Sequence, residues 1–303
     1  RVKRLKKISK TVILMLLILP SVFCGILAVK VGKLEREIDK LKSEEHRNLE
    51  IVWSDDAELI KTAEKQEQEP VKEESFVEEK VLLEDEILLE EENLRKVYLT
   101  FDDGPSMYTQ DILEVLKIYD VKATFFVTGM KPEYGERLQD ILDDGHSLAL
   151  HSFSHVYSDI YSSLDNFKND FNKLREYVYQ NTGEEINLFR FPGGSANNIV
   201  SPEVRKEILT WLEKEGIVYF DWNVSSGDGG NQILSPQEIA DNCIKGISDC
   251  NTAIVLLHDS SSKVTTIEAL PLIIEAVNEM ENTVLLPMDE ETTAIQQIRL
   301  REE

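Results

Sequence analysis

The sequence predicts an α/β fold, a distorted (β/α) barrel of about seven parallel strands, preceded by a transmembrane helix and an acidic linker that is helical or disordered. Three observations predict it. Short apolar runs alternate with amphipathic segments after residue 96, which is typical of parallel α/β architectures. Residues 11–29 carry no charge, and residues 53–96 are strongly acidic. Seven or so strand–helix repeats favour a barrel over a flat sheet.

Charge is distributed unevenly along the 303 residues. The chain holds 33 Lys and Arg against 57 Asp and Glu, for a formal net charge of −24, yet six of the first ten residues are basic. The excess negative charge therefore belongs to the rest of the chain. Because phosphate binding needs a basic surface, this composition argues against a nucleic-acid partner.

The N-terminal part of the sequence predicts a membrane anchor. Residues 11–29 are uncharged over 19 positions, so residues 11–30 are predicted to cross a bilayer as one helix. A cleaved signal peptide fits less well, because the apolar core is longer than usual and no small-x-small site closes it. The basic residues 1–10 predict a cytoplasmic N-terminus and a single pass through the cell membrane, with the remainder extracytoplasmic.

Two segments join the predicted span to the folded domain. In residues 31–52, apolar residues recur three and four positions apart, which predicts a short coiled coil with weak homodimerisation, or a solvated helix. Residues 53–96 hold sixteen Asp and Glu against six Lys and Arg, with one Pro and no Gly, which predicts a self-repelling linker. Residues 97–290 are predicted to form one folded domain, and residues 291–303 a C-terminal tail.

Within the predicted domain, strands rich in β-branched and aromatic residues alternate with amphipathic helices. The strands are predicted at residues 97–102, 123–128, 147–152, 188–191, 217–224, 252–258 and 284–287. The helices are predicted at residues 108–119, 164–180, 202–214, 236–247 and 267–280. In barrels of this kind the chemistry gathers where strands end, and the unusual polar residues of this sequence follow strand ends.

The first strand ends in two carboxylates, within V-Y-L-T-F-D-D-G-P-S. Burying Asp102 and Asp103 side by side costs free energy unless a metal, an arginine or a proton compensates their charges. An ordinary Asp-Gly-Pro turn is the alternative interpretation of this segment.

Three of the five histidines also lie at strand ends. His151 and His155 are four residues apart in H-S-F-S-H, and His258 ends the run A-I-V-L-L-H-D. Two imidazoles and one aspartate form a set that leaves coordination positions open for water, as catalytic zinc sites require. For H-S-F-S-H alone, a surface histidine pair is the alternative. The remaining histidines, His46 and His146, are assigned no function.

The fourth strand ends in F-R-F-P-G-G. An arginine between apolar neighbours usually has a carboxylate partner, and Asp102 is the natural candidate for Arg190. The Pro-Gly-Gly turn exposes backbone N–H groups, which are able to stabilise an oxyanion without any side chain. A plain turn with a solvated arginine is the alternative.

Taken together and in this order, these segments resemble the motifs of the polysaccharide deacetylases of carbohydrate esterase family 4, the NodB homology domain. The resemblance covers residues 97 to about 290, with T-F-D-D-G-P as the first motif, H-S-F-S-H the second, R-F-P-G the third and L-L-H-D the fifth. It implies that Asp103, His151 and His155 hold a divalent metal, usually zinc, with cobalt or another divalent ion as alternatives.

The resemblance also implies roles for residues around the metal. Asp102 would be the general base, tethered by Arg190, and His258 would protonate the departing amine. The backbone N–H of Gly193 would stabilise the oxyanion, and Leu256 would line the pocket for the acetyl methyl group. Many relatives carry Tyr where this chain has Gly193, so we expect a more open site.

The fourth motif departs from the family pattern Asp-Ser-x-Asp-Trp. The aligned segment here is S-S-G-D-G, so Ser225 replaces the first Asp and Gly229 replaces the Trp. Asp228 matches the carboxylate that would orient His258, and Asp221 is the second choice. The change at Gly229 puts in doubt the wall of the acetyl pocket rather than the chemistry.

Together with the predicted anchor, the resemblance implies a membrane-anchored, metal-dependent hydrolase that acts on carbon–nitrogen bonds other than peptide bonds. Its expected substrate is an N-acetylated cell-envelope polysaccharide, with peptidoglycan N-acetylglucosamine first and acetate as a product. An O-acetyl esterase on the same scaffold and an inactive, anchored wall-binding protein are the alternatives. The sugar, the metal, the oligomeric state and a disulfide between Cys243 and Cys250 stay open.

Overall fold

The structure is a computed structural model, and it describes residues 94–300. The predicted basic segment, transmembrane anchor and coiled coil, and almost all of the predicted linker, lie outside the described residues and stay predictions. Across residues 94–300, no helix combines the length and the apolar character needed to span a bilayer.

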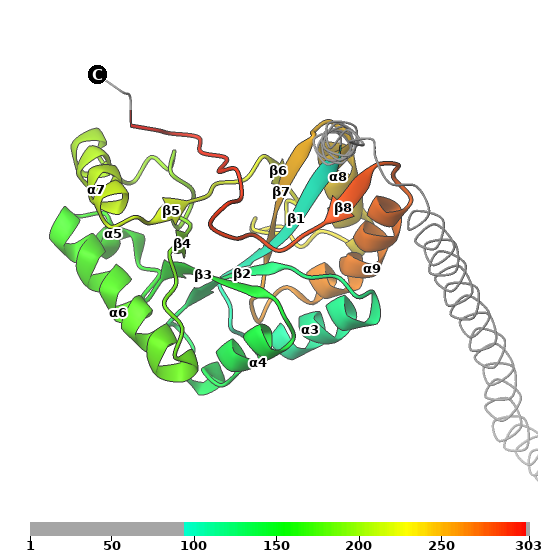
Figure 1. Cartoon of the computed structure of the whole chain (residues 1–303), viewed down its shortest axis with the longest axis horizontal. Helices are drawn as coiled ribbons and strands as arrows, with labels where there is room; N and C mark the ends of the chain where they lie inside the picture. Colours follow the sequence, from blue (N-terminus) through cyan, green and yellow to red (C-terminus); the bar gives the residue numbers. More distant parts are fainter. Residues whose placement is uncertain (1–93, 301–303) are drawn as a thin grey trace, which may run out of the picture. The chain divides into compact units, whose positions relative to one another are not determined.

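Strands and helices alternate along the described chain, as the sequence predicts (Figure 1). The strands are β1 (Arg95–Asp102), β2 (Thr124–Thr128), β3 (Ser147–Ser152), β4 (Leu188–Phe189), β5 (Val218–Tyr219), β6 (Val224–Ser225), β7 (Thr252–His258) and β8 (Thr283–Leu285). The helices are α3 (Thr109–Ile118), α4 (Arg137–Asp143), α5 (Tyr157–Ile160), α6 (Leu164–Thr182), α7 (Pro202–Lys214), α8 (Pro236–Ser248) and α9 (Val264–Asn278), with a 3-10 turn, η1, at Pro132–Tyr134. The short helices α4 and α5 were not predicted.

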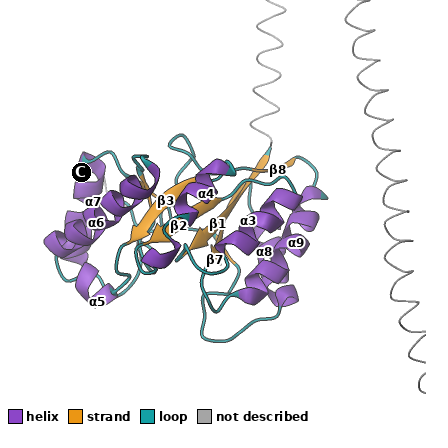
Figure 2. Ribbon diagram, turned by 90° about the horizontal axis from the view of Figure 1, so that it is seen from below, coloured by secondary structure: helices purple, strands orange, loops and turns teal. Residues whose placement is uncertain are grey.

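The strands form one parallel sheet that curls into a half-barrel. Their order is β5-β4-β3-β2-β1-β7-β6, and β8 pairs with the beginning of β1. Helices flank the curl, with α5, α6 and α7 beside β4 and β5, and α3, α8 and α9 beside β1 and β7 (Figures 1 and 2). The prediction of about seven parallel strands is confirmed, but within the described residues no strand pairing joins β5 to β6, so the barrel is not closed.

The predicted strand at residues 217–224 is wrong, because the chain leaves one edge of the sheet and joins the other within it. The N–H of Phe220 donates to the carbonyl of Phe189, the last residue of β4. Three residues later, the N–H of Asn223 donates to the carbonyl of Ile254 in β7. The segment is therefore divided into β5 and β6, which lie at opposite ends of the strand order.

Side chains alternate between the two faces of the curled sheet, as the two-residue period of a strand requires. The outward-facing strand side chains pack with the helices in the larger core cluster, which includes Val97, Leu99, Phe101, Phe125, Val127, Leu150, Val255 and Leu257. A second cluster contains no helix residue and fills the inside of the curl: Tyr98, Phe126, Ala149, Leu188, Phe220, Ile254 and Met288. Continuing this inner series along β1, β3 and β7 leads to residues 102, 151 and 258.

Serine caps begin three of the helices that cover the sheet. Ser163, Ser201 and Ser235 each accept a hydrogen bond from the third residue beyond them, which satisfies one of the unpaired N–H groups at a helix start. Pro202 and Pro236 follow two of these caps, where a missing N–H costs nothing. These local signals explain why the predicted helix starts at residues 164, 202 and 236 are confirmed.

Both boundaries of the predicted domain differ from the observed ones. β1 begins at Arg95 rather than residue 97, and its first residues pair with β7 and β8. The predicted C-terminal tail belongs to the domain at least as far as Ile298, whose N–H donates to Ser195 Oγ and whose carbonyl accepts from Tyr219. Cys243 and Cys250 are both free thiols.

Candidate active site

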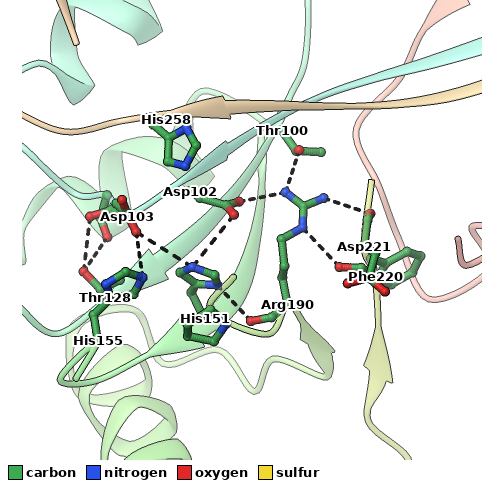
Figure 3. A network of polar contacts seen from close by, with 12 residues as sticks. Thr100, Asp102, Asp103, Thr128, His151, His155, Arg190, Phe220, Asp221 and His258 are labelled. Carbon is green, nitrogen blue, oxygen red and sulfur yellow. Dashed lines mark hydrogen bonds and ion pairs between the residues drawn. The ribbon is translucent and has the colours of Figure 1, made fainter. Parts of the chain in front are cut away.

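The register of the parallel strands brings the polar residues to one rim of the half-barrel. Asp102, the last residue of β1, lies directly opposite His258, the last residue of β7. Leu150 of β3 lies opposite Phe189 of β4, so the residues that follow them, His151 and Arg190, are neighbours. Because the carboxyl ends of parallel strands meet at one edge, four strands deliver one functional side chain each to the same place (Figure 3).

Asp103, His151 and His155 form the one candidate metal site among residues 94–300, with ligand atoms all within 4.8 Å of one another. His155 Nε2 lies 3.2 Å from Asp103 Oδ1, and His151 Nε2 lies 3.8 Å from the same oxygen. Asp103 and His155 both have left-handed backbones, with φ of 75° and 54°. Such a conformation costs on the order of 1–3 kcal/mol for a residue other than glycine, and strain of this kind is found at functional sites.

The chemistry of this donor set fits a cation. The Nδ1 of His151 lies 2.8 Å from the carbonyl oxygen of Arg190, and because a carbonyl only accepts, we assign the proton to Nδ1. The lone pair of Nε2 then faces Asp103 and the Oδ2 of Asp102, at 3.8 Å from each carboxylate. Burial, followed by the neighbouring His151, lowers the pKa of His155 and favours the neutral imidazole that a metal needs. Acceptors that converge in this way need a positive charge between them.

Asp170 of α6 holds the segment between His151 and His155. Its carboxylate accepts hydrogen bonds from Ser152 Oγ (2.7 Å) and from the backbone N–H groups of Phe153 (2.8 Å) and Ser154 (2.9 Å). Sequence reasoning missed this residue. The available signal was a charged residue three positions after the buried Phe167, on the apolar face of the helix.

Arg190 and Asp102 form the predicted ion pair in the interior of the curl. The Nη1 of Arg190 donates to Asp102 Oδ1 at 2.7 Å and to Thr100 Oγ1 at 2.8 Å. The guanidinium is fully buried and lies 3.9 Å from the centre of the Phe126 ring, with Nε bonded to the carbonyl of Phe220. Because one carboxylate oxygen is held by arginine, the other is directed toward His151.

His258 is paired with Asp228, the first of its two predicted partners. The Nδ1 of His258 donates to Asp228 Oδ1 at 2.7 Å, and its backbone N–H donates to Oδ2 at 2.9 Å. Ser226 and Thr266 donate to the same carboxylate, at 2.7 and 2.8 Å. Burial alone would lower the pKa of His258, but the hydrogen bond and charge of Asp228 outweigh it, so the pKa is raised. Asp228 therefore orients His258 despite the altered fourth motif.

Asp221, the second choice, serves another purpose. Its carboxylate accepts from the N–H and Oγ of Ser195, at 2.7 and 2.5 Å, and from the N–H of Gln297 at 2.7 Å. Ser195 directly follows the Pro-Gly-Gly turn. Asp221 thus joins that turn to the C-terminal segment at the open side of the half-barrel.

Two glycines permit close approaches at the rim. A Cβ on Gly229 would lie 2.6 Å from Cε1 of His258, so this loop packs flat against the imidazole. Gly193 has φ 75°, and a Cβ there would lie 3.1 Å from Cε2 of Tyr157. Leu256, two residues before His258 in β7, is 7% exposed on the same face. The expectation of an open site at Gly193 is therefore wrong, because Tyr157 occupies that space.

Asp259 secures the loop that follows the paired aspartates. It is fully buried, and it accepts hydrogen bonds from Ser106 Oγ (2.5 Å) and Thr109 Oγ1 (2.6 Å). Its N–H donates to the carbonyl of Asp102 at 2.8 Å. Burial raises the pKa of Asp259, since the hydrogen bonds compensate the charge only in part.

Comparisons with known proteins agree with this geometry. A family model described as polysaccharide deacetylase matches residues 90–210. The YheN protein of Bacillus subtilis (strain 168), which carries a polysaccharide deacetylase name, is 32% identical over 190 residues, and the match covers 61% of this chain and 64% of YheN. A peptidoglycan-N-acetylglucosamine deacetylase of Bacillus cereus (strain ATCC 14579) is 28% identical over 191 residues, which are 61% of this chain and 67% of that protein.

A solved structure is similar over more than two thirds of this chain. It is the catalytic domain of a peptidoglycan N-acetylglucosamine deacetylase from Eubacterium rectale ATCC 33656, at a TM-score of 0.64 and 35% identity. The similarity covers 69% of this chain and 94% of that domain. The chain thus spans nearly all of a solved catalytic domain, but less than two thirds of the length of YheN.

Proposed function

This chain belongs to the polysaccharide deacetylase family, and from that premise we propose that it removes N-acetyl groups by hydrolysis from a polysaccharide of the cell envelope. The proposed substrate is peptidoglycan, with N-acetylglucosamine as the first sugar, because the B. cereus and E. rectale relatives carry that activity in their names. One observation carries the proposal: a metal-type donor set, an arginine-held aspartate and an aspartate-held histidine converge on one rim.

We further propose that Asp103, His151 and His155 hold a divalent cation, with zinc as the first choice, because two imidazoles and one carboxylate are a typical catalytic zinc set. When bound, such a cation supplies Lewis-acid polarisation of the acetamide carbonyl and makes water a better nucleophile at neutral pH.

The remaining residues would move protons and stabilise charge. Asp102 would accept the proton of the attacking water through Oδ2, since Arg190 occupies Oδ1. The N–H of Gly193 would donate a hydrogen bond to the developing oxyanion. His258 would deliver a proton from Nε2 to the departing amine, because its Nδ1 is bonded to Asp228.

The His258–Asp228 pair also separates the proposal from its two rivals. An amine is too basic to leave without a proton, whereas an ester leaves with less help, so a carboxylate-oriented imidazole favours N-deacetylation over an O-acetyl esterase. An inactive wall-binding protein is disfavoured by the same contact, because the altered fourth motif still places Asp228 on His258.

Location outside the cytoplasmic membrane stays a proposal that rests on residues 1–30 of the sequence.

The test is acetate release from purified peptidoglycan by the full chain, with new free amines counted in parallel. We expect stoichiometric acetate and amine, loss of both in a chelator, and recovery with zinc or cobalt. Undiminished turnover in the chelator would refute the role of the metal. Acetate without new amines would indicate the O-acetyl esterase, and binding of wall fragments without acetate the inactive protein.

A further inference from the structure

Tyr157 lies between the candidate metal site and the Pro-Gly-Gly turn, and no step of the proposed reaction has used it. It is the first residue of α5, two residues after His155. Its ring packs edge to face on the imidazole of His155, with the ring centres 5.1 Å apart. It also meets Tyr161 at 6.0 Å, and the hydroxyl of Tyr161 donates to the carbonyl of Pro192 at 2.8 Å. Tyr157 thus contacts His155 directly and reaches the Pro-Gly-Gly turn through Tyr161.

The Tyr157 side chain fills the space over Gly193. A Cβ built on Gly193 would lie 3.3 Å from the Tyr157 hydroxyl oxygen and 3.1 Å from its Cε2. Because that Cβ would be bonded to the Gly193 Cα, the Tyr157 hydroxyl lies beside Gly193, the residue whose N–H the proposed reaction uses.

The hydroxyl of Tyr157 has no hydrogen-bond partner within residues 94–300. Because the side chain is only partly buried, this hydroxyl is not a buried polar group without a partner. This differs from its neighbour Tyr161, which is buried and bonded to Pro192. A phenol is protonated at neutral pH and offers one O–H donor. Tyr157 therefore presents a free donor beside His155 and Gly193.

We propose that Tyr157 is a catalytic residue whose hydroxyl donates a hydrogen bond to the carbonyl oxygen of the scissile acetamide, as a second donor beside the N–H of Gly193. This inference rests on the proposed deacetylation. The phenol keeps its proton throughout, and it stabilises the negative charge that develops as water adds to the carbonyl carbon. A donor that acts on the transition state more than on the substrate raises kcat more than it lowers KM.

The decisive variant is Tyr157→Phe in the full, zinc-loaded chain, because it removes the hydroxyl and keeps the ring over His155 and Gly193. We expect kcat for acetate release to fall on the order of 10²-fold, the typical cost of one lost oxyanion donor, with KM changed less than about threefold. Tyr179→Phe, an exposed tyrosine near the end of α6, is the matched control and should leave both constants unchanged.

Two other kinetic outcomes would overturn the assignment. Unchanged kcat in Tyr157→Phe would mean that only the ring matters, as a wall of the acyl pocket. Tyr157→Ala would then admit N-propionyl substrates that the wild type rejects. A raised KM with unchanged kcat would instead place the hydroxyl on a sugar group away from the reacting carbonyl.

Binding of acetate gives a readout that does not depend on turnover. The carboxylate of this product offers an oxygen where the carbonyl oxygen would lie, so Tyr157→Phe should weaken acetate binding by calorimetry while zinc affinity stays equal to that of the wild type. Equal acetate affinity in the two proteins would contradict the inference. If the wild type releases no acetate from any wall material, the proposed function fails, and the acetate comparison still decides the position of the Tyr157 hydroxyl.

Discussion

The candidate site has two halves. The complete half is the pair of His258 and Asp228, and the incomplete half is Asp102, Asp103, His151 and His155. The two halves compensate buried charge in opposite ways. At the carboxylate of Asp228, four protein donors converge, so this half is complete within the chain. Around His151 Nε2, two carboxylates and a lone pair face one another at 3.8 Å, and no donor of the described chain lies between them. The comparison teaches that the chain itself supplies all the partners of the Asp228 carboxylate, whereas the acceptors around His151 would need the proposed cation to complete them.

The largest effect should come from removing a residue of the incomplete half. Asp103→Ala or His151→Ala deletes one of three metal-type donors, so we expect loss of stoichiometric zinc and a fall of more than about 10³-fold in acetate release. Zinc content by mass spectrometry and acetate by an enzymatic assay check this. A variant that keeps one zinc per chain and works within tenfold of the wild type would break the comparison.

The complete half should lose activity without losing metal. His258→Ala removes the proposed acid, and we expect kcat to fall about 10²–10⁴-fold, with zinc content unchanged. Loss of zinc in this variant would contradict the independence of the two halves.

The pH profile sharpens the same point. Burial lowers the pKa of His258 and Asp228 raises it to a greater extent, so Asp228→Asn should lower it. Because His258 must be protonated to donate, the alkaline limb of kcat/KM should then move to lower pH. An unmoved limb would show that another group is the acid.

A smaller effect is expected from the support of the incomplete half. Asp170→Asn weakens the hold on the loop between His151 and His155, and residues that orient metal ligands typically contribute 10–100-fold in metal affinity. Competition with a zinc-binding dye measures this. Glu176→Gln, at an exposed position of the same helix, is the control and should bind zinc as the wild type does.

The smallest effect on kcat should come from a side chain added next to His258 in the complete half. Gly229→Ala places a Cβ against the His258 ring, and a shift of the imidazole by a few tenths of an ångström should lower kcat about 3–10-fold, since 1 Å of misplacement costs up to about 10²-fold. Gly230→Ala, whose Cβ would meet nothing closer than 3.7 Å, is the matched control. Equal kcat in both variants would show that the imidazole position is not limiting.

The residues of the site that could be predicted from the sequence are those that lie at the ends of strands. Asp102, His151, Arg190 and His258 each close a short apolar run, and parallel strands bring such ends together, so residue type and position were enough. Their roles remain proposals. The order of the four motifs along the chain then indicated the resemblance to the polysaccharide deacetylase family.

The missed features depend on contacts that no local pattern encodes. Asp170 bonds to backbone groups 16 and 17 residues away, and Tyr157 covers a glycine from another loop. The division of residues 217–224 was missed because strands of two residues carry no periodicity, and the crossing is fixed by hydrogen bonds to Phe189 and Ile254. Helices as short as α4 and α5 also lie below the length at which an amphipathic pattern can be read.

The direction of β1 separates the start of the described domain from the candidate site. The strand enters the domain at Arg95 and delivers Asp102 at the opposite end, seven steps away, or roughly 23 Å at 3.3 Å per residue. Arg95 therefore lies at the edge of the sheet away from the rim that carries Asp102 and His258. The entry of the chain into the domain and the candidate site thus occupy the two ends of a single buried strand.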